Sequence, residues 1–154
     1  MRGRRSWRRF SPHALAVQSP RKLLFENSAE APINVRTQFL NNVNQNRVVA
    51  TGQNFEIALK PEKIPVQYNC DIYPWMHGWI LVSPHPYAAV SDASGNFTIN
   101  GLPTGEWEFQ VWHERVGSLK TADWPKGRFT LDIKHGKNNL GIVKLKPEVL
   151  ENRR

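Results

Sequence analysis

Residues 66–76 read VQYNCDIYPWM, and this stretch says most about how the chain folds. Its first part alternates, with Val66, Tyr68 and Cys70 separated by polar side chains. Period-two alternation is typical of a β-strand with one face buried and the other in water. Its second part places the Cys70 thiol and the Met76 thioether at the two ends of a proline-containing loop. We therefore predict a strand followed by a loop that presents two sulfur side chains.

Short segments of the same kind recur along the chain, and none has the pattern of a long amphipathic helix. Glycine, proline and small polar residues separate them, which is the composition of turns. The asparagine-rich residues 41–46 are expected to form a loop. Many short strands at this spacing predict an all-β sandwich. The other predicted strands are 23–25, 55–59, 79–82, 88–90, 97–99, 107–111, 129–133 and 140–145.

The formal net charge of +8 is concentrated at the two ends of the chain. Five arginines lie within residues 1–9 and two more close the chain, so the body between them is nearly neutral. Such tails hold phosphates non-specifically, and we expect no nucleic-acid partner beyond that. The single cysteine excludes an internal disulfide. No apolar run reaches the roughly 20 residues of a membrane span, and the first thirty residues show no signal-peptide core.

The loop has the two sulfur ligands of a blue-copper site. A blue-copper centre uses a Cys thiolate, two His imidazoles and a weak axial Met. The loop supplies Cys70 and Met76 but has no histidine between them. Two sulfurs without imidazole can hold Cu(I) loosely, yet they cannot form the trigonal site that tunes copper for electron transfer. The alternative is that Cys70 is a small buried apolar residue and Met76 fills space in the core.

This loop resembles the C-x-I-H-P-W-M loop of cupredoxin-like proteins of the planctomycete type, also described as plastocyanin-like or methylamine-utilisation-like. Tyr73 stands where that family has its loop histidine. The family's other histidine lies in an N-S-D-x-x-x-H-N segment. Asn27 and Asn34 match that segment, and Ile33 stands at the histidine.

The resemblance covers about residues 8–147 and includes an F-x-P-H segment at 10–13. It implies a cupredoxin-like Greek-key β-sandwich whose type-1 copper site has lost both nitrogen ligands. Ile33 and Tyr73 are then not ligands in this chain. It also implies a periplasmic or secreted location, although the sequence itself shows no signal peptide.

Residues 90–107 resemble the carboxypeptidase regulatory-like, or transthyretin-like, β module, with its D-x-x-G-x-F hairpin and G-L-P-x-G segment. Here the Asp92 carboxylate can cap the turn and Gly95 can supply a positive φ. Phe97 and Ile99 are then expected to return to the core. Modules of this fold are related to carbohydrate-binding sandwiches, so exposed aromatic side chains suggest a sugar platform. Trp75 and Trp124, both beside prolines, are the candidates.

These observations predict two associated β modules, a cupredoxin-like sandwich followed by a small transthyretin-like half. The predicted boundaries are a basic tail 1–9, the sandwich 10–83, the second module 84–147 and a tail 148–154.

We expect a non-catalytic, extracytoplasmic binding or accessory protein with no resident cofactor, whose partner is a protein or a glycan. No protease, hydrolase or phosphate-loop motif points to an enzyme. The first alternative is a copper electron-transfer or copper-carrier protein with a rearranged site of Cys70, Met76 and His77, joined by His85 or His113. The second alternative is a carbohydrate-binding module.

Overall fold

The computed structural model describes residues 9–151, and strands make up nearly all of its regular structure. The predicted all-β class is therefore confirmed. The chain divides into two compact units, one ending at Ile99 and the other beginning at Asn100. The boundary between the two modules that we infer from the sequence, at residues 83 and 84, stays a prediction. The basic residues 1–8 lie outside the described part.

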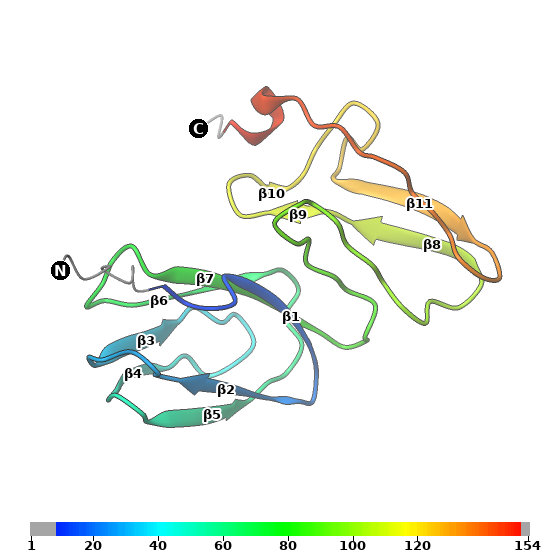
Figure 1. Cartoon of the computed structure of the whole chain (residues 1–154). Helices are drawn as coiled ribbons and strands as arrows, with labels where there is room; N and C mark the ends of the chain where they lie inside the picture. The colour runs from blue at the N-terminus through cyan, green and yellow to red at the C-terminus, as the bar shows by residue number, and fades with distance from the viewer. Residues whose placement is uncertain (1–8, 152–154) are drawn as a thin grey trace. The chain divides into compact units, whose positions relative to one another are not determined.

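A five-stranded sheet forms the larger layer of the first unit (Figure 1). Strands β1 and β7 run parallel, with Ala14 paired to Trp79, and the other neighbours run antiparallel. The order across the sheet is β1 (Ala14–Gln18), β7 (His77–Ser83), β6 (Val66–Asn69), β3 (Ile33–Thr37) and β4 (Asn46–Val49).

A second layer, the antiparallel pair β2 (Lys22–Glu26) and β5 (Asn54–Ala58), completes a sandwich in this unit. The inward residues of both layers share one core, as the alternation of the sequence requires. Phe25 belongs to this core, stacked on Phe55 and edge-on to Tyr68. The other buried members are Ile33, Val35, Phe39, Val49, Leu59, Val66, Cys70, Met76, Ile80 and Val82.

The second unit is built on the antiparallel pair β8 (Gly105–Gln110) and β11 (Arg128–Ile133). Phe109 and Phe129 face each other across this pair with ring centroids 5.4 Å apart. Two shorter strands, β9 (Trp112–His113) and β10 (Gly117–Ser118), form a small hairpin. Near the chain end, η1 (Pro147–Leu150) is a single 3₁₀ turn.

Most predicted strands are present, and the exceptions are informative. No strand forms at 88–90, 97–99 or 140–145. The Asp92 turn is confirmed, because the Asp92 carboxylate accepts the backbone N–H groups of Ser94 and Asn96 at 2.8 and 2.9 Å, and Gly95 has a φ of 84°. The backbone N–H of Asn96 is the main reason that the pKa of Asp92 is lowered. The expectation that Phe97 returns to the core is wrong, since its side chain is 52% exposed.

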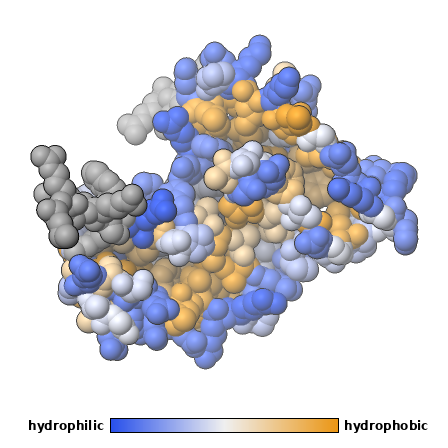
Figure 2. Space-filling view, viewed as in Figure 1, coloured by the Kyte–Doolittle hydropathy of each residue, from blue (hydrophilic) through white to orange (hydrophobic). Residues whose placement is uncertain are grey.

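Hydrophobic and hydrophilic surface alternate on the face shown in Figure 2. A folded protein keeps much apolar surface in contact with water, so scattered apolar residues do not by themselves identify a partner. Within residues 9–151, no helix is long and apolar enough to cross a membrane. Within residues 9–99, the most exposed large apolar side chains are Leu40, Val43, Val48, Trp75 and Phe97.

Glu62 anchors the asparagine-rich loop after β3. Its carboxylate is 5% exposed and accepts the backbone N–H groups of Leu40 and Asn41, the latter at 2.9 Å. Glu62→Ala would leave these donors without their charged acceptor. We expect it to lower the free energy of unfolding by roughly 2 to 4 kcal/mol, measured by urea unfolding. The exposed Glu56→Ala is the control, and an equal effect of both changes would contradict this role.

Candidate functional site

Backbone hydrogen bonds join the two ends of the loop that runs from Cys70 to Met76. Cys70, at the end of β6, is 1% exposed, and Met76, just before β7, is also buried. The Cys70 N–H donates to the Met76 carbonyl at 2.9 Å, and the Met76 N–H donates to the Tyr73 carbonyl at 2.8 Å. These bonds bring the two ends of the loop together. The backbones of Cys70 and Met76 are therefore adjacent.

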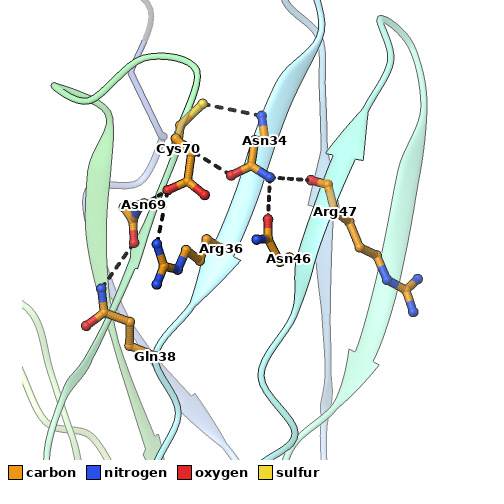
Figure 3. Close-up of polar contacts among 8 residues, drawn as sticks. Asn34, Arg36, Gln38, Asn46, Arg47, Asn69 and Cys70 are labelled. Atoms are coloured by element: carbon orange, nitrogen blue, oxygen red, sulfur yellow. Dashed lines mark hydrogen bonds and ion pairs between the residues drawn. The ribbon is translucent and has the colours of Figure 1, made fainter.

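Asn34 of β3 holds this loop against the sheet (Figure 3). Its backbone N–H donates to Cys70 Sγ at 3.3 Å, and its side-chain Oδ1 accepts the N–H of Asp71 at 3.1 Å. Its Nδ2 donates to Asn46 Oδ1 at 2.7 Å, on the neighbouring strand β4. One buried amide thus joins the thiol loop to two strands. Asn34 matches a segment of the family that the sequence resembles, but that match does not indicate this role.

The polar rim beside the thiol is neutral overall. Arg36 lies 3.6 Å from the carboxylate of Asp71, and Asn69 donates to the same carboxylate at 3.0 Å. Gln38 in turn donates to Asn69 Oδ1 at 3.2 Å (Figure 3). Both members of the ion pair are substantially exposed, so it adds little to stability. Its effect is to leave no net charge at this edge of the loop.

The residues around Cys70 do not fit a type-1 copper centre. Ile33 is buried in the core and Tyr73 packs against it, and neither side chain supplies an imidazole nitrogen. Within residues 9–151, Cys70 belongs to no group of three or more histidine, cysteine or carboxylate side chains. Cys70 and Met76, the two sulfur residues of the loop, are both buried there. Without nitrogen donors, the trigonal geometry of a blue-copper site cannot form.

His77 does not join the two sulfurs, because strand geometry turns it away from them. Along the loop end and β7, Met76, Gly78 and Ile80 are buried, whereas His77 and Trp79 are only half-buried. Successive side chains of a strand point to opposite faces. His77 therefore projects from the sheet face opposite the core that holds Cys70. The rearranged site of Cys70, Met76 and His77 receives no geometric support from this arrangement.

The other two candidate histidines are engaged locally. His85 lies after β7 with its Nδ1 3.1 Å from Ser83 Oγ, and its ring stacks on Tyr87. His113 lies in β9, in the second unit, where its Nδ1 accepts the N–H of Arg115 at 3.2 Å. Hydrogen bonds of this kind orient imidazoles within turns. They give neither histidine a place beside Cys70.

A groove of about 780 Å³ lies over the outer face of the five-stranded sheet. Its lining includes Gln67 and Asn69 of β6 and His77 of β7, which are the positions that alternate with core residues. Within the described part of the chain no carboxylate lines it, and the charge of Arg36 is balanced by Asp71. Its amide side chains are Gln38, Asn44, Gln45, Asn46, Gln67 and Asn69.

The two candidate aromatic residues differ in their surroundings. Trp75 is 60% exposed and lies beside Pro74, which lines the groove, with its ring centroid 5.5 Å from that of Tyr73. Trp124, in the second unit, is half-buried and stacked on Phe129 at 4.7 Å. Trp75 is therefore presented to solvent, whereas much of the Trp124 ring is used in packing.

Tyr68 joins the core to the start of β1. Its hydroxyl donates to the Pro12 carbonyl at 2.9 Å, and burial raises its pKa from 10.0 to about 12. Below pH 10 the phenol is protonated whether the chain is folded or unfolded. Between pH 10 and 12 the unfolded chain loses this proton first, so the free energy of unfolding falls as pH rises.

The Tyr68→Phe variant tests this titration. We expect it to cost about 1 kcal/mol at neutral pH through the lost hydrogen bond. It should also lose less stability than the wild type between the unfolded pKa of 10.0 and the folded pKa of about 12, measured by urea unfolding at each pH. Parallel stability curves for the two proteins would contradict the assignment.

A comparison of folds finds solved structures that resemble part of this chain. Similar solved structures include a purple cupredoxin from Nitrosopumilus maritimus, 24% identical, which covers 47% of this chain and 80% of its own at a TM-score of 0.41. Two amicyanin variants, one reduced and one in the Cu(I) form, are each 18% identical. They cover 49% of this chain and 73% of their own, with TM-scores of 0.43 and 0.44. No family model and no curated protein matches the sequence.

Proposed function

We propose that this chain is a non-catalytic, extracytoplasmic binding or accessory protein of the copper-protein kind, in which the thiol site has become structural. One observation carries the proposal: the Cys70 sulfur is buried beside Met76, and Ile33 and Tyr73 occupy the positions at which the resemblance expects imidazoles. A thiol in such surroundings behaves as a small apolar side chain. The hydrogen bond from Asn34 gives the sulfur a defined partner.

The groove over the outer face supplies the binding surface in this proposal. Its volume falls in the range of about 300 to 1,000 Å³ that small-molecule sites occupy. Amide side chains such as Gln67 and Asn69 both donate and accept hydrogen bonds. They carry no charge, so a neutral, polar ligand or a polar backbone segment of a partner protein suits them best.

Copper titration tests the structural role of the thiol. With Cu(II), we expect the wild type to show no intense thiolate-to-copper band in visible absorption, and Cys70→Ser to behave in the same way. Metal analysis of both proteins purified without chelator should give equal copper contents. An intense visible band that disappears in Cys70→Ser would overturn the proposal and establish the copper-carrier alternative.

Glycan binding is the second candidate, favoured by the exposed Trp75 beside the amide groove. Sugar rings stack on aromatic faces while their hydroxyl groups bond to amides. A glycan array should then retain a ligand that Trp75→Ala loses. Trp124→Ala is the matched control, because that ring is packed against Phe129. Retention of no glycan, or equal loss in both variants, would refute this candidate.

A further inference from the structure

We propose that His13 and His77 form a surface site for a divalent transition-metal ion such as Zn²⁺ or Cu²⁺. The two histidines are 64 residues apart in the sequence, yet their ring centroids are 5.3 Å apart with the planes at 76°. A ring nitrogen of each lies within 4.8 Å of one on the other. A modest side-chain rotation brings two nitrogens to the roughly 2.0 to 2.1 Å that zinc requires from each.

The backbone around the two histidines is fixed, so the site is positioned before any ion arrives. The Trp79 N–H donates to the His13 carbonyl at 2.8 Å, and this bond begins the parallel pairing of β1 with β7. Tyr68 holds the preceding residue, Pro12, through its hydroxyl. Pre-positioned ligands lose less conformational entropy on binding.

Gly78, between His77 and Trp79, allows the two segments to approach. A Cβ at this position would lie 2.7 Å from the His13 carbonyl oxygen and 2.5 Å from Tyr68 Oη. Both distances are shorter than real Cβ contacts. The closeness of the two histidines therefore depends on a glycine that the sequence places directly after His77.

The hydrogen bond of His13 determines which of its nitrogens can bind a metal. Its Nδ1 lies 3.1 Å from the His77 carbonyl oxygen. A carbonyl only accepts, so Nδ1 carries the proton and the lone pair of the neutral ring is on Nε2. Metal-binding histidines are usually oriented in this way, by a hydrogen bond from the ring nitrogen that does not bind the metal.

The donor set selects the class of metal. Neutral imidazole suits Zn²⁺, Cu²⁺ and Ni²⁺, whereas Ca²⁺ and Mg²⁺ prefer oxygen ligands. The site is separate from the thiol, because His77 projects from the opposite sheet face to the core that holds Cys70. His77 also lines the groove, so the metal site adjoins the proposed binding surface.

A zinc titration of the full chain in a non-chelating buffer, measured by isothermal titration calorimetry, tests the site. Wild-type protein should saturate at one equivalent. His77→Ala should weaken binding about tenfold or more. His13→Asn should do the same, because asparagine keeps an N–H that can bond to the His77 carbonyl but has no Nε2. His85→Ala and Cys70→Ser should leave the affinity unchanged.

Unchanged affinity in His13→Asn or in His77→Ala, or an equal loss in His85→Ala, would overturn the proposal. Loss of affinity in Cys70→Ser would also overturn it, because the ion would then be bound at the thiol. Electron paramagnetic resonance of the wild type with one equivalent of Cu²⁺ needs no variant to fold. It should show splitting from two equivalent nitrogens, and a spectrum without nitrogen splitting would equally refute the site.

Discussion

Gly78→Ala is expected to destabilise the first unit strongly, by about 3 kcal/mol or more. The new methyl group would meet the Tyr68 ring, its hydroxyl and the His13 carbonyl oxygen, all closer than real Cβ contacts allow. Tyr68 is buried and bonded to Pro12, so its ring has little freedom to move aside. The remaining way to relieve the contact is to displace the segment that precedes β1, which separates His13 from His77.

Gly52→Ala is the matched control for this change. Gly52 has a φ of 73°, and nothing lies within 4 Å of a Cβ placed there. Its substitution should cost only the backbone strain, roughly 1 to 2 kcal/mol. Urea unfolding gives both free energies, and zinc titration should show weakened binding in Gly78→Ala alone. Equal stability of the two variants would contradict the close-contact argument.

The strands that the sequence predicts best are those with one wet face. Residues 66–70 alternate because Val66, Tyr68 and Cys70 face the core and the residues between them face the groove. Strand β3 escaped prediction because Ile33, Asn34 and Val35 are all buried, and burial on both faces removes the period of two. Residues 97–99 have the strand pattern, yet Phe97 is exposed and no strand pairs with them.

Of the two candidate sites, one could be predicted from the sequence and the other could not. The loop from Cys70 to Met76 was predictable because its ends are close in sequence and its residue types are unusual. The pairing of His13 with His77 was not, since it depends on the parallel alignment of β1 with β7. A local pattern contains no signal for such a register. The F-x-P-H segment at 10–13 marked His13 as noteworthy without indicating its neighbour.

Two imidazoles introduced beside the thiol should create a copper site. In an Ile33→His, Tyr73→His variant, we expect Cu(II) to produce the intense visible band that the wild type lacks. Ile33 precedes Asn34, whose N–H already donates to Cys70 Sγ, and Tyr73 packs on the same core. Without copper, replacing the buried Ile33 with histidine should lower the free energy of unfolding by roughly 2 to 3 kcal/mol. Copper should restore part of this loss, because it binds only the folded chain.

The experiment is cleanest in the His13→Asn background, which keeps copper away from the surface pair. Each single variant supplies one nitrogen and should give at most a weak band. The double variant should give an intense band that Cys70→Ser removes, which identifies the sulfur as a ligand. If the double variant folds and binds copper without that band, the two positions do not face the thiol. Tyr73 and Ile33 would then be ordinary packing residues.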